Sequence, residues 1–179
     1  MGRLNDISLV TQVAVFHNKR AFDQLVREYQ SPVRRFFLNQ TAGDSQLSDD
    51  LAQETFIKAY TSIGQFRGTS SFLTWVTRIA YNVYYDYRRS QRQTEDIDTV
   101  AVRAMSSQHV SRGEQMDIYQ ALAQLKDDER TCITLQLIDG YPIDQIATMT
   151  GIQPNTVKSH LKRGKEKLAN YLRENGYDR

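Results

Sequence analysis

Apolar side chains recur along most of the chain at the three- and four-residue spacing of a helix. The first stripe consists of Phe22, Leu25, Val26 and Tyr29. Asn18 precedes it and can cap this helix with its side chain. Pro32 predicts a break or a fresh first turn, with Ser31 as the cap of a second segment. The polar stretch 39–46 predicts a loop.

Two further helices are predicted on either side of a short loop. Ser48 can cap the first of them, and the carboxylates of Asp49 and Asp50 would complement its positive N-terminal end. Its apolar face contains Phe56, Ala59, Tyr60 and Ile63. Gly64 is expected to end it, and Ser71 to cap a longer helix. The stripe of that helix is Phe72, Trp75, Val76, Ile79, Ala80, Val83 and Tyr87.

The pattern changes between residues 93 and 112, where polar and acidic residues replace the periodic apolar ones. A flexible linker is the prediction, and a weak helix over the same residues stays open. Asp127 or Asp128 is expected to cap a helix in the second half. No strand pattern or internal repeat is present in the sequence. The chain therefore predicts an all-α fold of two small helical domains, 1–92 and 113–179, with 93–112 as the linker.

Residues 142–167 predict a helix-turn-helix. Pro142 suits the first turn of a helix, where its missing N–H costs little. Gly151 can adopt the left-handed conformation that ends this helix and begins the turn, and Pro154 begins the second helix. The packing positions of the first helix are Ile143, Ile146, Ala147 and Met149.

The second helix of this motif separates into an apolar and a basic face. Its apolar positions are Val157, Leu161, Gly164, Leu168 and Leu172. The opposite face carries Asn155, Thr156, Lys158, Ser159, Lys162, Arg163 and Lys165. Early polar side chains of such a helix can reach base edges, while lysine and arginine bind phosphates. A plain helical hairpin would not explain the small alanine, the turn glycine and the one-sided basic face together, so the pattern predicts DNA binding.

Histidine and cysteine are sparse, which argues against metal and disulfide chemistry. His160 is expected to contact a phosphate or base or to be solvated, and neither His17 nor His109 has a ligand-like spacing to it. No metal site is predicted. The single cysteine, Cys132, lies in an apolar stretch and predicts a buried packing residue rather than a reactive thiol.

Charge is informative in its distribution rather than its total, which is +2 over 179 residues. Residues 154–179 carry seven Lys or Arg and three acids, whereas residues 44–54 carry four carboxylates and no Lys or Arg. One DNA-facing and one protein-facing surface would explain this asymmetry, and solvated helix faces would explain the charges equally well. No signal region or membrane-length apolar run is visible, so a cytoplasmic protein without membrane insertion is expected.

The first half adds several motifs in a specific order. They are DLAQETFIKAY at 50–60, Phe66-Arg67-Gly68, Phe72-Leu73-Thr74-Trp75, Ile79-Ala80-Tyr81-Asn82 and Asp86-Tyr87-Arg88-Arg89. Together with the helix-turn-helix they resemble the extracytoplasmic-function (ECF) sigma factors, the smallest members of the bacterial sigma-70 family. The resemblance extends from about residue 21 to 172 and includes the order of sigma domain two, linker and sigma domain four. It implies a transcription initiation factor that binds core RNA polymerase, directs it to promoters and assists melting, with no cofactor and no enzymatic activity.

The resemblance also implies roles for residues of the first domain. The residues that would bind core polymerase are Asp49, Asp50, Gln53, Glu54, Phe56 and Ile57. The residues that would recognise and melt the downstream, minus-ten element are Phe66, Arg67, Ser70, Arg78, Tyr81, Asn82, Tyr85, Arg88 and Arg89. Opened bases need aromatic side chains on which to stack, at about 1–3 kcal/mol per base. Which tyrosines of 81–87 stack on DNA and which belong to the core stays open.

The helix-turn-helix would then bind the double-stranded upstream, minus-thirty-five element. Its expected contacts are Gln153, Asn155, Thr156, Lys158, Ser159, His160, Lys162 and Arg163. Family members often have Arg at the position of His160 and Ala at that of Gly164, where glycine weakens a helix by about 1 kcal/mol. Many such factors are held by an anti-sigma protein, which is a further expected partner. Promoter sequence, regulon and inducing signal cannot be read from the residues.

Two other functions are compatible with parts of the sequence. A metal-dependent nuclease could use Asp49, Asp50 and Glu54, but no histidine, lysine or further acidic cluster completes that site. A helix-turn-helix repressor or activator that acts without core polymerase would bind duplex DNA tightly by itself. A sigma factor instead requires core polymerase for promoter-specific transcription, and this requirement separates the two hypotheses.

Overall fold

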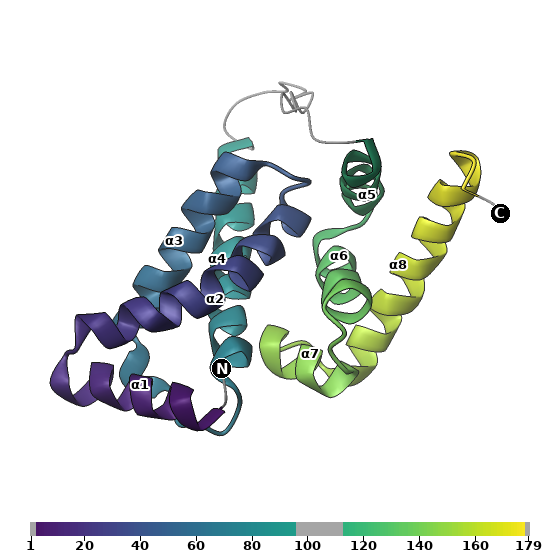
Figure 1. The fold of residues 1–179 in the computed structure, drawn as a ribbon. Helices are drawn as coiled ribbons and strands as arrows, with labels where there is room; N and C mark the ends of the chain where they lie inside the picture. Colours follow the sequence, from purple (N-terminus) through teal and green to yellow (C-terminus); the bar gives the residue numbers. More distant parts are fainter. Residues whose placement is uncertain (1–2, 96–112, 178–179) are drawn as a thin grey trace.

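The computed structural model describes residues 3–95 and 113–177, which are helical with short connections (Figure 1). The first half contains α1 (Arg3–Phe16), α2 (Lys19–Gln40), α3 (Ser45–Thr61), the 3-10 turn Ile63–Gln65 and α4 (Phe72–Glu95). The second half contains α5 (Gly113–Ala123), α6 (Asp127–Ile133), the π turn Thr134–Ile138, α7 (Ile143–Thr150) and α8 (Pro154–Glu174). This confirms the all-α prediction with two helical domains. Most of the predicted linker, 96–112, lies outside the described residues.

Helix α2 runs without a break through Pro32, so the predicted second segment capped by Ser31 is wrong. A proline inside a helix removes one backbone hydrogen bond and costs about 3 kcal/mol in isolation. Burial on one face both before and after Pro32 offsets this cost, because Leu25, Phe36 and Phe37 are all nearly inaccessible to solvent. The predicted cap at Asn18 is confirmed, since its side chain accepts hydrogen bonds from the N–H groups of Arg20 and Ala21.

The next helix begins earlier than expected. Asp44, not Ser48, is the cap of α3, and its carboxylate accepts a 3.0 Å hydrogen bond from the N–H of Leu47. Ser48 is buried one turn into the helix, where its hydroxyl donates to the backbone oxygen of Asp44 at 2.6 Å. The predicted cap of the following helix is confirmed, because the Ser71 hydroxyl accepts a hydrogen bond from the N–H of Thr74 at 3.1 Å.

The second domain forms around α6 and α8. Neither Asp127 nor Asp128 is the cap of α6. The helix begins at Asp127 after Lys126, whose N–H donates to the Glu129 carboxylate at 3.2 Å. The helix-turn-helix is confirmed as α7 and α8, with Gly151 left-handed at φ 76° and Pro154 in the first turn of α8. Pro142 precedes the first residue of α7 instead of lying within its first turn.

Side chains of α7 and α8 fill the core of this domain. Ile146, Met149 and Val157 are fully buried, and Leu161 nearly so. Leu172 is an exception to the predicted apolar face of α8, because it lies near the helix end and is 39% exposed. In the part of the chain that is described, no helix is both long and apolar enough to cross a membrane.

The two domains pack against each other along α4. Figure 1 shows α4 of the first domain between its own helices and those of the second domain. Helix α4 contacts α7, and α2 contacts α6. Buried side chains from both halves form one continuous apolar cluster. This arrangement places the second domain directly on a helix that is expected to bind DNA.

Candidate protein-binding and DNA-binding surfaces

An apolar groove of about 490 Å³ lies between α2 and α3 in the first domain. Its floor is formed by Phe22, Val26, Ala52, Phe56 and Tyr60. The rings of Phe22 and Tyr60 meet edge to face, with their centroids 5.0 Å apart. Polar residues of both helices, including Arg34, Asp49 and Gln53, form the rim. An apolar floor with a charged rim can bind an amphipathic segment of another protein.

The six residues expected to bind the polymerase lie on α3, and four of them line this groove: Asp49, Gln53, Phe56 and Ile57. Asp50, Gln53 and Glu54 are exposed, and Ile57 keeps 58% of its surface accessible, whereas Phe56 is buried in the floor. Asp49 forms an ion pair with Arg34 across the rim. Helix α3 therefore presents carboxylates and an apolar side chain together, as a basic partner with apolar side chains of its own would require.

Helix α4 has one exposed and one covered side among the residues expected to bind the minus-ten element. Asn82, Tyr85 and Arg89 are exposed, and the Tyr85 ring lies 5.6 Å from that of Tyr81. Tyr81 itself is only 8% exposed, because it faces the second domain. Of the two tyrosines in the set that is expected to bind the minus-ten element, Tyr85 is thus exposed and Tyr81 is covered.

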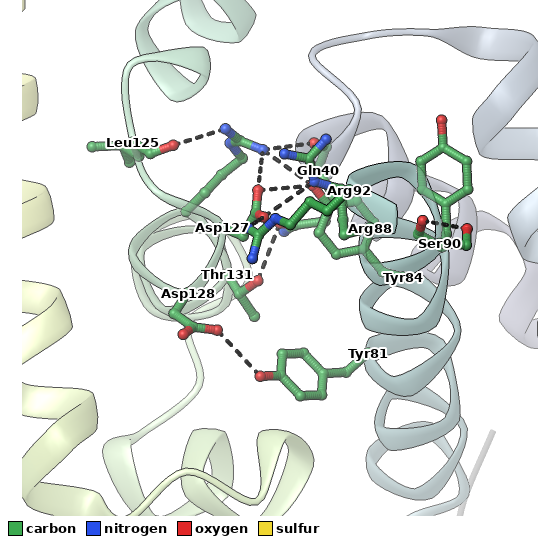
Figure 2. A network of polar contacts seen from close by, with 12 residues as sticks. Gln40, Tyr81, Tyr84, Arg88, Ser90, Arg92, Leu125, Asp127, Asp128 and Thr131 are labelled. Atoms are coloured by element: carbon green, nitrogen blue, oxygen red, sulfur yellow. Dashed lines mark hydrogen bonds and ion pairs between the residues drawn. The ribbon is translucent and has the colours of Figure 1, made fainter. Parts of the chain in front are cut away.

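The covered side of α4 is held by a polar network from α6 (Figure 2). The Asp127 carboxylate accepts hydrogen bonds from Arg88 Nε and Arg92 Nη2, each at 3.1 Å. The hydroxyl of Tyr84 lies 3.3 Å from Asp127 Oδ1, and that of Tyr81 lies 3.3 Å from Asp128 Oδ1. The first turn of α6 therefore places two carboxylates against α4 side chains that are expected to bind DNA.

The phenols in this network stay protonated. Burial raises the pKa of Tyr84 to about 12, with opposing effects from Arg130 and Asp127. Burial and the neighbouring Asp128 also raise the pKa of Tyr81. Both hydroxyls therefore remain hydrogen-bond donors at neutral pH, and the buried contact does not depend on their ionisation.

Arg78 is the third member of the minus-ten set that the second domain occupies. Its guanidinium donates to the backbone oxygen of Thr148 on α7 at 2.9 Å. The loop members of the set lie at the other end of α4. The Phe66 ring packs edge to face on Phe72 and Trp75, while Arg67 is exposed and Ser70 half-buried. The aromatic cluster fixes the position of this loop at the start of α4.

The predicted DNA-binding face of α8 is open to solvent. Its exposed members are Gln153, Asn155, Thr156, Lys158, Ser159, Lys162 and Arg163. His160 is half-buried, and its Nδ1 lies 3.2 Å from Arg163 Nη2. Arg163 also lies 3.5 Å from the buried Glu129 carboxylate. Within the described residues Lys158 and Lys162 form no ion pair, so their charges are available to an anionic partner.

The single cysteine of the chain is a packing residue in the core. Cys132 is fully buried, as predicted, and burial raises the pKa of its thiol to about 12. Among the described residues, no group of three or more His, Cys, Asp or Glu side chains could hold a metal ion.

Two family models match the chain. They are Sigma-70 region 2, over residues 25–94, and Sigma-70 region 4, over residues 115–168. The RNA polymerase sigma-H factor of Pseudomonas aeruginosa is 33% identical over 84% of this chain and 86% of its own length. The ECF RNA polymerase sigma-E factor of Escherichia coli is 32% identical over 94% of both chains. This chain belongs to the ECF sigma factors.

Two solved structures support the assignment of this chain to the sigma factors. CnrH in complex with the cytosolic domain of CnrY matches with a TM-score of 0.70 and 25% identity, over 95% of this chain and 98% of CnrH. RpoE of Bartonella quintana in complex with the anti-sigma factor NepR also gives 0.70, with 26% identity, over 88% and 98% of the two chains. Both similarities extend across the two domains.

Sequence reasoning missed the side chains of the sigma factor that join the two domains. The local sequence around Asp127 predicts only a helix cap. Gln40 fell in a predicted loop, but it ends α2 and bonds to Thr131 and Thr134. Periodicity carries no information on such pairs, because their partners lie some 40 to 90 residues away in the chain.

Proposed function

We propose that this sigma factor binds core RNA polymerase through α3 and directs the enzyme to promoters through α4 and α8. The observation that carries the proposal is one chain with two kinds of surface: an acidic and apolar groove, and a solvent-exposed basic recognition helix. The groove suits a protein and the helix suits a duplex. A sigma factor requires both, because it must position the polymerase on DNA. It would act in the cytoplasm and have no catalytic role of its own.

The polymerase contact is assigned to Asp49, Asp50, Gln53, Glu54, Phe56 and Ile57. Burial of Phe56 makes it a support for the groove, while Ile57 is the exposed apolar anchor beside the carboxylates. Such an anchor with charges around it is the usual composition of an energetic hot spot. The same groove is also available to an anti-sigma protein, in keeping with the complexes in which relatives have been solved.

The upstream element is assigned to the open face of α8. Gln153, Asn155, Thr156, Lys158 and Ser159 lie on its first turns, where recognition helices reach base edges. His160, Lys162 and Arg163 follow with side chains suited to phosphates. The downstream element is assigned to Phe66, Arg67, Ser70, Arg78, Tyr81, Asn82, Tyr85, Arg88 and Arg89. Exposed Tyr85 and Asn82 are the side chains best placed to meet an unpaired base first.

A repressor that acts without polymerase is not favoured. Its N-terminal domain would have to bind a ligand or a second subunit, whereas residues 25–94 of this chain match Sigma-70 region 2. Domain bounds of 1–92 and 113–179 remain part of the proposal, with α4 extending to Glu95.

Core association is the deciding experiment. The full chain is mixed with core RNA polymerase from the bacterium that encodes it, and binding is followed by fluorescence anisotropy. Transcripts from a genomic DNA library are then sequenced. We expect binding and a set of defined start sites that are absent with core enzyme alone. Duplex binding by the isolated chain, with no core association, would support the repressor instead.

A matched pair of variants localises the contact. Ile57→Lys places a charge at the proposed anchor, and Ile118→Lys makes the same change on α5, where the isoleucine is 52% exposed. The first variant should weaken core binding at least roughly tenfold, as hot-spot side chains do. The second should bind like the parent chain. Equal affinity of both variants would remove α3 from the proposed interface.

A further inference from the structure

Helix α1 contributes no residue to the binding surfaces proposed above, yet it lies against the loop that is proposed to read the minus-ten element. This 66–71 loop connects the 3-10 turn Ile63–Gln65 to α4. Helix α1 contacts α2, the 3-10 turn and α4, and Figure 1 shows it at the end of the first domain where α4 begins. One side of α1 is buried there through Leu9, Val10 and Val13. The helix therefore contacts the elements that precede and follow the loop.

Ile7 of α1 reaches the turn of the loop at Gly68. A Cβ built on Gly68 would lie 3.4 Å from Ile7 Cδ1 and 3.6 Å from its Cγ1, so the loop backbone passes directly beside the isoleucine side chain. Gly68 has a φ of 68°, a left-handed conformation that favours glycine. Ile7 keeps 38% of its surface exposed, so it is not a residue of the deep core. Its side chain instead supports the loop from the side of α1.

The beginning of the loop is fixed by aromatic packing. The Phe66 ring lies 5.7 Å from that of Phe72 and 5.6 Å from that of Trp75, both on α4. Phe72 also packs on Tyr29 of α2, with 5.2 Å between the ring centroids. Arg67 follows this cluster directly and is exposed. Its position relative to a DNA strand therefore depends on the turn that comes next in the loop.

A buried hydrogen bond fixes α1 on α2, one residue away from Ile7. The Tyr29 hydroxyl donates to Asp6 Oδ2 at 2.7 Å, and the two side chains are 8% and 3% exposed. Within the described residues the other oxygen, Asp6 Oδ1, has no hydrogen-bond partner. Loss of a donor to a buried carboxylate is costly, so this hydrogen bond favours one placement of α1 on α2. Because Asp6 and Ile7 are adjacent, that placement also brings Ile7 beside the loop.

We propose that α1 positions the 66–71 loop for recognition of the minus-ten element. Ile7 supports the turn of the loop, and the Asp6–Tyr29 hydrogen bond fixes the helix that carries it. The inference rests on the function proposed above for the loop. Side chains that form a binding site must be held within about 0.5 Å of the productive geometry by the packing around them. Ile7 and Tyr29 are therefore positioning residues, which act on DNA through the loop.

Promoter discrimination by the holoenzyme tests this role. Two templates compete in one transcription reaction: a promoter found with the parent holoenzyme, and the same promoter with one minus-ten base pair substituted. The ratio of the two transcripts measures discrimination. This ratio does not depend on how much of a variant is folded or bound to core polymerase. A purely structural defect would lower both transcripts and leave the ratio unchanged.

Ile7→Ala should reduce discrimination at one or more minus-ten positions roughly threefold to fivefold, a part of the roughly fivefold to hundredfold effect of one wrong base pair on binding. Ile7→Leu keeps an apolar side chain of the same size and should discriminate like the parent chain. Val15→Ala is the matched control, because it shortens another apolar side chain of α1 that is 61% exposed and about two turns further along. It should also discriminate like the parent chain. Every variant should discriminate equally against substitutions in the minus-thirty-five element, which α8 is proposed to read.

Tyr29→Phe separates positioning from direct contact with DNA. Tyr29 is too buried to touch a base, and phenylalanine keeps the ring against Phe72 while the hydroxyl that holds Asp6 is lost. This variant should reduce the same ratios about twofold, since one hydrogen bond contributes modestly to the placement of α1. A reduction with Ile7→Ala alone would make Ile7 a direct DNA contact and overturn the positioning role, as would unchanged ratios in both variants.

Failure of the proposed function gives a different result. Absence of core-dependent transcription by the parent chain would contradict that function, as would a parent holoenzyme that does not distinguish minus-ten substitutions. If the parent holoenzyme does distinguish them and the α1 variants distinguish them equally well, the proposed function stands and the role of α1 is wrong.

Discussion

At the scale of single residues, Glu129 joins the two halves of the second domain. Its carboxylate is 2% exposed and lies 2.6 Å from Lys167 Nζ. Burial raises its pKa, but hydrogen bonds from Lys167 and from the N–H of Lys126, with the nearby charge of Arg163, leave the pKa below the usual value of 4.5. The ionised carboxylate therefore stabilises the contact between α6 and α8.

The pH dependence follows from this lowered pKa. A carboxyl whose pKa is lower in the folded state stabilises the fold above its unfolded-state pKa, and loses this effect as pH falls through the folded value. Glu129→Gln should lower the free energy of unfolding at pH 7 by about 1.5–3 kcal/mol, as for a hydrogen bond between charged groups. The deficit should shrink below about pH 4.5. Urea titrations at pH 7, 5, 4 and 3.5 measure it, with exposed Glu166→Gln as the control. A deficit that stays constant across this range would contradict the assignment.

Gly164 lies where α8 packs tightly against α6. A Cβ on this residue would lie 2.6 Å from Ile133 Cγ1, a distance at which the Ile133 side chain or the backbone must shift. Alanine would gain about 1 kcal/mol of helix propensity, but overpacking costs about 1–3 kcal/mol. Glycine here is thus a packing requirement of this chain, with weaker intrinsic helix formation as its consequence.

Gly164→Ala should therefore leave the chain less stable by about 1 kcal/mol, because the steric cost exceeds the gain in propensity. Thermal denaturation followed by circular dichroism measures the change. In an Ile133→Ala background the same substitution should be neutral or stabilising, since the clashing atoms are gone. Simple additivity of the two substitutions would show that the close approach has no energetic consequence.

At the scale of elements, α8 has one face in the core and an opposite face that is proposed to bind DNA. The salt dependence of DNA binding tests this second face. Lys162 is exposed and forms no ion pair within the described residues, so it is free to release counterions on binding. Lys162→Gln should weaken promoter binding by the holoenzyme and reduce the slope of log K against log salt by about 1. Arg173→Gln, in the last turn of α8, should leave that slope unchanged. Identical slopes in both variants would show that the duplex does not bind this face of α8.

Element boundaries show where local rules were overridden. Asn18, Ser71, Gly151 and Pro154 act as their local chemistry predicts, because a cap or a turn needs only its immediate neighbours. Pro32 behaves differently, since apolar burial on both sides of it keeps α2 continuous. At the start of α3, Asp44 and Ser48 were both chemically suitable caps. Packing decided between them, because Ser48 is buried.

At the scale of the whole molecule, the contact between the domains should couple their stabilities. Thr131 on α6 donates to Gln40 on α2, and both are almost inaccessible to solvent. The chain has one tryptophan, Trp75, and it lies in the first domain. Its fluorescence therefore reports unfolding of the first domain, even when a substitution is made in the second.

Thr131→Val keeps the shape of the side chain but leaves the Gln40 amide oxygen without this donor. The loss should lower the free energy of unfolding by about 1–2 kcal/mol, and the urea midpoint read from Trp75 should fall accordingly. Thr148→Val makes the same change on an exposed side chain that bonds only within α7. It should have little effect on that midpoint. If Thr131→Val leaves the urea midpoint read from Trp75 fluorescence unchanged, the two domains unfold independently.

Sequence information was enough to predict the helices, their division between two domains, the helix-turn-helix and the family. All of these follow from local spacing, turn chemistry and the order of motifs, which need no knowledge of distant contacts. Which tyrosines of α4 are exposed depends instead on how the second domain packs against that helix. Tyr85 is exposed, whereas Tyr81 and Tyr84 are buried against α6. Tyr81 and Tyr85 lie one turn apart on α4 but have different environments, because the second domain packs on one side of this helix. The periodic pattern of the sequence does not indicate which side that is.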